Sequence, residues 1–306
     1  MSTTTNEIAT GTFVTDGGLE TDLIFNHGID LPDFAAFPLV EDEAGRRRLT
    51  AYYEEYADIA ARAGAALLLE TPTWRANPDW AARLGYDAAA LDRANRASVE
   101  LVRTVAERRA GDLSRAVISG QVGPRGDGYR PGAAVDPDEA ADYHRPQLSS
   151  FAAAGADVAT ALTLTDVGEA IGVSRAAREV GIPVAISFTV ETDGRLPGGT
   201  SLRDALAAVD AAAPPAYFLI NCAHPTHVSR GLEEGAWLER IHGLRVNAST
   251  MSHEELDDSE ELDAGDVLQL GHDVAALRAA LPGVRIVGGC CGTDSRHVAQ
   301  MWGVAG

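Results

Sequence analysis

Near the end of the chain stands the stretch Val284-Arg285-Ile286-Val287-Gly288-Gly289-Cys290-Cys291-Gly292-Thr293, a β-branched run that stops at a turn of glycines and cysteines. Such a pattern is typical of the C-terminal end of a buried strand. The remaining cysteine, Cys222, ends a similar run, Tyr217-Phe218-Leu219-Ile220-Asn221. If these two strand ends are neighbours in space, three thiols converge on one point. Three thiolates with one open position form a known kind of catalytic zinc site.

The cysteines also have plainer interpretations. Three is an odd number, so the chain cannot pair all its cysteines in disulfides. A bridge between the adjacent Cys290 and Cys291 would be strained, because neighbouring Cα atoms are only about 3.8 Å apart. All three cysteines could instead be small buried hydrophobic residues. The glycines around the Cys-Cys pair favour the metal site, since they allow both sulfurs to turn toward one ion.

Working outward from this stretch, apolar runs alternate with segments of helical periodicity along the whole chain. The predicted strands are 11–15, 65–71, 116–122, 157–163, 183–189, 217–222, 244–248 and 284–287. The predicted helices are 49–63, 88–109, one beginning near 137, 167–180, 201–212, 228–241, 274–281 and 295–301. Eight such units predict an α/β fold, a single (β/α)8 TIM barrel domain over residues 1–306 with a long loop, 19–48, after strand 1. A doubly wound sheet is the main competitor. In a barrel, strands 6 and 8 present their C-terminal ends to one shared face.

The composition excludes several kinds of partner. Lys and Arg number 25 against 45 Asp and Glu, a formal net charge of −20, which argues against nucleic acid or an anionic membrane. Neither a secretory signal nor an apolar run of the roughly 20 residues needed to span a bilayer is visible. We expect a cytoplasmic protein with reduced thiols.

The cysteine spacing also indicates a type of chemistry. Three ligands from two distant strands differ from the closely spaced Cys-x-x-Cys pairs of structural zinc knuckles. A thiolate-rich site selects zinc or copper(I) over magnesium or calcium. Zinc held in this way could bind a thiol substrate and remove its proton, which suits alkyl transfer to sulfur.

The sequence resembles the homocysteine S-methyltransferase family over nearly its whole length, from about residue 11 to 302. The resemblance is carried by Asp16-Gly17-Gly18 after strand 1, Ser187-Phe188-Thr189 in strand 5, Asn221-Cys222 and the Gly-Gly-Cys-Cys-Gly-Thr motif at 288–293. It implies a zinc-dependent (β/α)8 barrel that moves a methyl group from a sulfonium or quaternary ammonium donor, such as S-methylmethionine, S-adenosylmethionine or betaine, to homocysteine, producing methionine. It also implies that Cys222, Cys290 and Cys291 are the catalytic zinc ligands, and that Asp16, Gly17 and Asn221 belong to the substrate site.

The chain departs from the family pattern at the fourth strand, where Leu162 stands at the position expected for the glutamate that holds the amino group of homocysteine. Either the register differs slightly, another acid such as Glu20 or Glu70 takes over, or the acceptor is another thiol. Glu70 is the favoured substitute because it ends the second strand, although it could instead pair with Arg75.

Trp74 is a candidate contact for an onium donor, since cations favour aromatic faces. It could equally anchor its loop. His224, two residues beyond Cys222, is either a fourth ligand or second-shell partner of the metal, or a solvent contact at a helix start. The predicted function is therefore a zinc-dependent thiol methyltransferase. The alternatives are a divergent zinc and thiol-binding barrel that acts on a non-amino-acid thiol or as a non-catalytic sensor, and a different barrel enzyme with structural cysteines.

Overall fold

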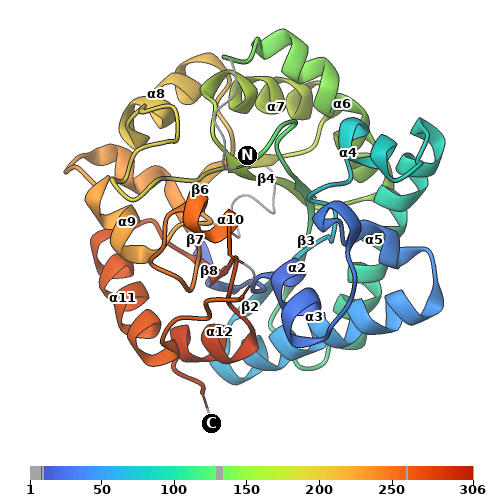
Figure 1. Cartoon of the computed structure of the whole chain (residues 1–306), viewed down its shortest axis with the longest axis horizontal. Helices are drawn as coiled ribbons and strands as arrows, with labels where there is room; N and C mark the ends of the chain where they lie inside the picture. Colours follow the sequence, from blue (N-terminus) through green and yellow to red (C-terminus); the bar gives the residue numbers. More distant parts are fainter. Residues whose placement is uncertain (1–7, 9, 129–133, 260, 306) are drawn as a thin grey trace.

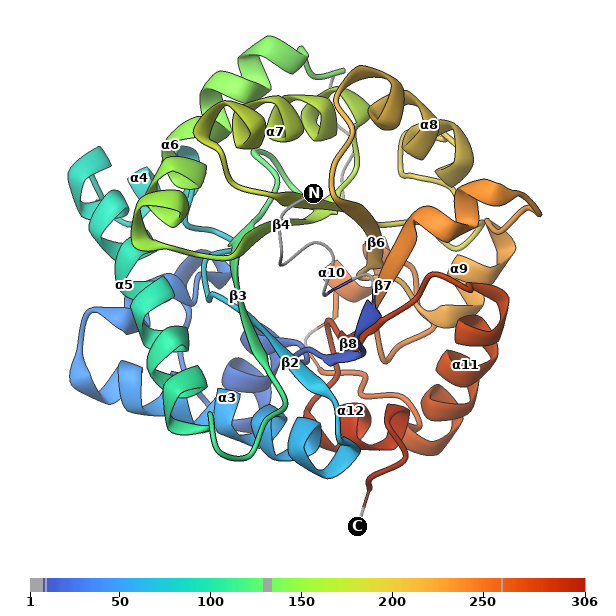
Figure 2. The same cartoon turned by 180° about the vertical axis from the view of Figure 1, so that it is seen from behind.

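Eight parallel strands close into a barrel in the order β1 to β8, and β1 completes the ring by pairing with β8 through Phe13 and Ile286. The computed structural model describes residues 8, 10–128, 134–259 and 261–305. The helices surround the strands on all sides (Figures 1 and 2). The predicted barrel is thus confirmed, and closure of the sheet excludes the doubly wound alternative. The strands are β1 (Phe13–Val14), β2 (Ala66–Glu70), β3 (Ala116–Val122), β4 (Val158–Leu164), β5 (Val184–Phe188), β6 (Tyr217–Asn221), β7 (Ile241–Val246) and β8 (Ile286–Gly289).

Most of the outer helices begin and end at the residues that local chemistry favours. For α6, Pro137 occupies the first turn after the Asp136 cap, and Gly155 ends the helix in the left-handed conformation with φ 76°. The long helices are α3 (Glu43–Ala63), α5 (Ala88–Arg108), α6 (Pro137–Ala154), α7 (Val167–Val180), α8 (Leu202–Ala212) and α11 (Val267–Ala280). Shorter ones are α4 (Pro78–Arg83), α9 (Pro225–Arg230), α10 (His253–Asp257) and α12 (Ser295–Met301).

The predicted helix 228–241 is wrong. α9 ends at Arg230, the short 3-10 helix η4 covers Ala236–Arg240, and β7 already begins at Ile241. Gly231 packs directly against the backbone of Gly194, and such a close approach turns the chain away from helical continuation. The acidic segment after β7 also contains α10, which begins at a Ser252 capping box.

The predicted long loop after strand 1 is largely made of short helices. They are α2 (Leu19–Thr21), the π-helix η1 (Asp22–Asn26), and the 3-10 helices η2 (Pro32–Phe34) and η3 (Phe37–Val40). Leu23, Phe37 and Val40 are fully buried, so this connection is packed onto the barrel. α10 lies over the centre of the barrel, in front of the strands in Figure 1 and behind them in Figure 2.

Side chains that point into the barrel change character along its axis. One apolar cluster fills the half nearer the strand starts, and includes Phe13, Leu68, Val117, Val158, Ala185, Leu219 and Ile286. Because alternate residues of a strand face the same side, the residues two positions further along form the next inward layer. All but one of these are polar and buried: Thr15, Glu70, Ser119, Thr160, Ser187 and Asn221, with Gly288 in β8. Arg245 of β7 joins this layer, and Arg245 and Asn221 line a cavity at the C-terminal ends of the strands.

Among the described residues, no helix is long and apolar enough to cross a membrane.

Candidate metal centre and substrate cavity

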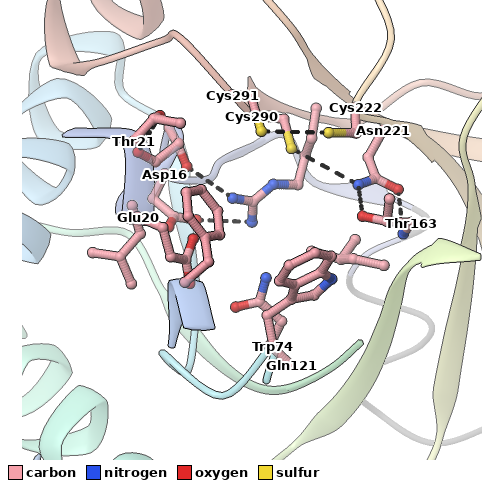
Figure 3. Close-up of a pocket in the computed structure, with 16 residues that line it drawn as sticks. Asp16, Glu20, Thr21, Trp74, Gln121, Thr163, Asn221, Cys222, Cys290 and Cys291 are labelled. Carbon is pink, nitrogen blue, oxygen red and sulfur yellow. Dashed lines mark hydrogen bonds and ion pairs between the residues drawn. The ribbon is translucent and has the colours of Figure 1, made fainter. Parts of the chain in front are cut away.

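Three thiols meet at the C-terminal ends of β6 and β8. Cys222 directly follows β6, and Cys290 and Cys291 directly follow β8. Their sulfur atoms all lie within 4.8 Å of one another, and those of Cys222 and Cys291 are 3.6 Å apart (Figure 3). Cys222 is buried, whereas Cys290 and Cys291 are partly exposed. The predicted convergence of the thiols is therefore confirmed, and the triad could hold a metal ion.

The hydrogen bonds within the triad favour an ionised sulfur at Cys290, whereas the same bonds and burial raise the pKa of Cys222 well above its usual value. Hydrogen bonds from the thiols of Cys222 and Cys291 hold the pKa of Cys290 well below its usual value, and the Arg245 guanidinium lowers it further. Three soft donors on one side and a cavity on the other match an open, thiolate-rich metal site. The residues present therefore fit the metal that the sequence implies.

Cys222 holds its sulfur in place through an unusual backbone conformation. Its φ of 57° is left-handed, which for a non-glycine residue costs roughly 1–3 kcal/mol. Its carbonyl oxygen accepts hydrogen bonds from His253 Nε2 at 2.6 Å and Thr189 Oγ1 at 3.1 Å. The other ring nitrogen of His253, Nδ1, lies 2.9 Å from Glu191 Oε1. Because both ring nitrogens face oxygen acceptors, the ring is best satisfied when it carries both protons. Burial would lower the pKa of His253, but the bond to Glu191 raises it above its usual value.

Asn221 connects strands 4, 5 and 6 beneath the thiols. Its Oδ1 accepts from Thr163 N at 2.8 Å and Ser187 Oγ at 2.6 Å. Its Nδ2 donates to Thr163 Oγ1 at 2.8 Å and points at Cys290 Sγ from 3.9 Å. Thr163 is also left-handed, with φ 62°. The hydrogen bonds of Asn221 thus hold strand ends and a sulfur in place. Its predicted contact with substrate stays a prediction.

Arg245, on β7, is the buried cation beside the triad. Its guanidinium pairs with Asp16 Oδ1 at 2.8 Å and donates to the carbonyl oxygens of Gly17 at 3.1 Å and Gly289 at 3.2 Å. Burial alone would lower the pKa of Arg245, but the carboxylates of Asp16 and Glu70 raise it, so the residue stays charged. Asp16 Oδ2 also accepts from Tyr52 at 3.2 Å. Arg245 therefore ties the turn after β1 to the turn that carries Cys290.

A cavity that is open to solvent lies against the triad. Figure 3 shows the cysteines on one side of it, with Trp74 and Gln121 across from them and Glu20 beside Asp16. Gly17 is part of its wall, and a Cβ there would come within 2.6 Å of the Tyr56 hydroxyl, so only glycine fits. The lining includes most predicted site residues: Asp16, Gly17, Trp74, Asn221, Cys222, Cys290 and Cys291, with Leu162 and Glu20.

Glu70 is not among the described residues that line this cavity; it points into the barrel interior below it. Its carboxylate oxygens are buried and have no hydrogen-bond partner of good geometry among the described residues, so the predicted pairing with Arg75 is absent there. Burial raises the pKa of Glu70 to about 7, against the opposing effects of Arg245 and the hydroxyls of Ser119 and Thr160. Its predicted contact with substrate remains a prediction.

Trp74 stands between the first cavity and a second one. The second has a volume of about 300 Å³ and shares Thr21, Phe34, Trp74 and Cys291 with the first. Its wall adds Phe25, Arg75 and His253, and the acids Asp127, Asp257, Glu261 and Asp263. The guanidinium of Arg75 stacks 4.3 Å from the Trp74 ring centre, so Trp74 is anchored as well as exposed to both cavities.

His224 caps α9, where its Nδ1 accepts from Thr226 N at 3.3 Å. It is buried, and the metal-ligand cluster in the described part of the chain contains the three cysteines without it. Sequence reasoning missed Arg245 and His253. The signal for Arg245 was present, because an arginine inside an apolar strand needs a buried partner.

A closed (β/α)8 barrel with three cysteines around an open cavity defines a class of metal-site barrel proteins. A model of the homocysteine S-methyltransferase family matches residues 13–304. The chain therefore belongs to the homocysteine S-methyltransferase family, a family of methyltransferases.

Individual relatives agree with this assignment. The chain is 29% identical over 306 aligned residues to a homocysteine S-methyltransferase of Escherichia coli (strain K12), covering 94% of this chain and 93% of that one. It is 27% identical over 192 residues to homocysteine S-methyltransferase YbgG of Bacillus subtilis (strain 168), a match that covers only 60% of each chain. The fold is that of the Escherichia coli homocysteine methyltransferase MmuM. Its metallated form has a TM-score of 0.73 at 24% identity, with 96% of each chain covered.

Proposed function

We propose that this protein is a zinc-dependent S-methyltransferase that moves a methyl group from a small onium donor to homocysteine or a related thiol. The observation that carries the proposal is the juxtaposition of three thiols within 4.8 Å with a cavity that opens beside them. Cysteines that were merely structural would not need two sulfurs partly exposed to that cavity. This argues against the alternative of structural cysteines.

Cys222, Cys290 and Cys291 would hold the zinc ion. When bound, zinc supplies a Lewis acid that lowers the pKa of an acceptor thiol. Arg245 contributes a fixed positive charge beside the sulfurs, and its bonds to Gly17 and Gly289 hold the two turns that face the acceptor. Preorganised charges of this kind do not need to reorient during the reaction.

The second cavity suits a cationic methyl donor. Phe25, Phe34 and Trp74 offer aromatic faces, and four acids lie along the same wall. Trp74 and Cys291 belong to both cavities, so a donor there would lie next to the triad. The acceptor sulfur would attack the methyl carbon in line with the leaving group. A new S–C bond forms as the onium C–S or C–N bond breaks, and the donor leaves as a neutral thioether or amine. Alignment of the two substrates would provide much of the acceleration.

The test combines metal analysis with turnover. Purified protein kept reduced and free of chelators is expected to contain about one zinc per chain, and to methylate homocysteine with at least one of S-methylmethionine, betaine or S-adenosylmethionine. Cys290→Ser should lose both properties, with turnover reduced about a thousandfold or more, because the site loses a ligand. Thr293→Ser is the matched control in the same turn, since it keeps the hydroxyl that donates to Cys290 O at 2.7 Å. Zinc without turnover across a broad thiol panel would favour a sensor instead, and protein without zinc would contradict the proposal.

A further inference from the structure

One carboxylate in the cavity has no counter-charge. Among the described residues that line it, the carboxylates are those of Asp16 and Glu20. Asp16 is paired with Arg245 at 2.8 Å and bonded to Tyr52. Glu20, in α2, forms no ion pair with any described residue and faces the cavity beside Asp16 (Figure 3). A carboxylate in such an enclosed place is costly to ionise without a partner, and burial accordingly raises the pKa of Glu20 to about 7.

The protein's own cation is committed elsewhere. Arg245 is near enough to oppose the rise in the pKa of Glu20, but its guanidinium donates to Asp16, Thr15, Gly17 O and Gly289 O. No lysine or other arginine lines the cavity within the described residues. A ligand would therefore supply the counter-charge of an ionised Glu20.

In the described part of the chain, the opposite wall of the cavity has no carboxylate that could bind an ammonium group. Leu162 of β4 lines the cavity with an apolar side chain at the position where the family pattern has a glutamate. Next to it on β3, Gln121 lines the same cavity, and its side-chain amide makes no hydrogen bond to a described residue. The cavity thus has thiols on one side, an unpaired acid on a second and a neutral amide on a third. This pattern fits a ligand with a soft sulfur at one end and an ammonium group at the other.

We propose that Glu20 binds the ammonium group of the acceptor, so that the acceptor is an amino-thiol whose charge is recognised by the turn after β1 and not by β4. The inference rests on the proposed function, because the triad must bind the thiol end. It assigns the acceptor class, and it places amino-group recognition on a residue three positions beyond Gly17. The carboxylate of β4 is then dispensable, which accounts for Leu162.

Binding can be measured without any methyl donor. We suggest loading the protein with cobalt(II) in place of zinc and following the thiolate-to-cobalt absorption while titrating homocysteine or 4-mercaptobutanoate, which lacks only the amino group. The wild type should bind homocysteine at least about tenfold more tightly, as expected for a charge-assisted hydrogen bond. Glu20→Gln should weaken homocysteine binding about 10- to 100-fold and leave 4-mercaptobutanoate within about twofold.

Two further variants make the result specific. Asp22→Asn removes a charge from the same segment outside the cavity lining, and should leave both affinities unchanged. The double variant Glu20→Gln/Leu162→Glu returns a carboxylate to β4 and should recover part of the preference for homocysteine.

Several outcomes would overturn the proposal: equal affinity of the wild type for the two thiols, equal weakening of both by Glu20→Gln, or no change of the cobalt absorption with either thiol. An effect of Glu20→Gln on the KM of the methyl donor alone would assign Glu20 to the donor and also overturn it. Selective binding without methyl transfer would instead leave the inference standing while the proposed function fails.

Discussion

The two sides of the cavity differ in how completely their polar groups are satisfied. On the side of β6 to β8, the polar atoms of Asn221 and the guanidinium of Arg245 are engaged by strand ends, turns and a carboxylate. On the side of β1 to β4, Glu20 and Gln121 face the cavity, Glu20 forms no ion pair with a described residue, and the buried Trp74 Nε1 has no hydrogen-bond partner among them. Buried polar groups are normally paired, so unpaired groups at a cavity mark the place of a ligand.

This difference separates the side that holds the metal site from the side that binds exchanging ligands. The side that carries the thiols is fixed by hydrogen bonds before any ligand arrives, as a metal site requires. The other side keeps its polar groups open for molecules that enter and leave. The left-handed residue Cys222 belongs to the fixed side, and Thr163 of β4 is bonded to that side through Asn221, so surrounding bonds can hold the strained backbone of both.

Of the changes that test this difference between the two sides, replacing Arg245 should have the largest effect on stability. Arg245→Met leaves the buried Asp16 carboxylate without its cation, so we expect the free energy of unfolding to fall by about 3–5 kcal/mol. Arg240→Met is the matched control. That arginine precedes the same strand and pairs with Asp210 at 2.8 Å, but about a third of each side chain is exposed. It should cost about 1 kcal/mol or less. Urea unfolding at fixed metal content measures both, and similar costs for the two variants would show that the ion pair with Asp16 does not hold the site together.

Arg245 also shows where reasoning from the sequence stops. The barrel could be predicted because each strand and most helices carry their own local signals, and the thiols could be located because Cys222 and the Cys290-Cys291 pair end two such strands. The partners of Arg245 are more than two hundred residues away in the chain, at Asp16 and Gly17. No local pattern encodes such a contact.

Other misses have the same origin. His253 acts through the carbonyl of Cys222 and the carboxylate of Glu191, both distant in sequence. The false helix 228–241 arose because apolar spacing continues past Gly231, whereas the close packing of Gly231 on Gly194 is a tertiary effect. Glu70 was favoured as the substitute acid because it ends a strand. Its inward direction follows from the alternation of side chains, yet its depth below the cavity depends on the stagger of the barrel strands.

A smaller effect should come from Glu70, and it should depend on pH. Burial raises its folded-state pKa from the usual 4.5 to about 7, so the folded protein holds this proton more tightly than the unfolded chain. Stability is then lost as pH rises from about 4.5 to 7, and the loss stays constant above. Because glutamine does not titrate, Glu70→Gln should gain stability relative to wild type over this range, by about 2–3 kcal/mol between pH 5 and pH 8. Thermal or urea unfolding at several pH values provides the measurement. A difference that does not vary with pH would mean that Glu70 is not held in a desolvated site.

The smallest effect should come from loosening one bond on the fixed side. Asn221→Asp keeps an acceptor for Thr163 N and Ser187 Oγ, but removes the Nδ2 donor that bonds Thr163 Oγ1 and points at Cys290 Sγ. It also adds a negative charge beside the sulfurs. We expect zinc affinity, measured by competition with a chromophoric chelator, to fall about tenfold while the fold remains intact. Ser187→Ala removes only a bond to the Asn221 oxygen, so it should change the affinity less than about threefold. If both variants weakened zinc binding equally, the role of Asn221 would be to join the strands, and its donor would not act on the sulfur.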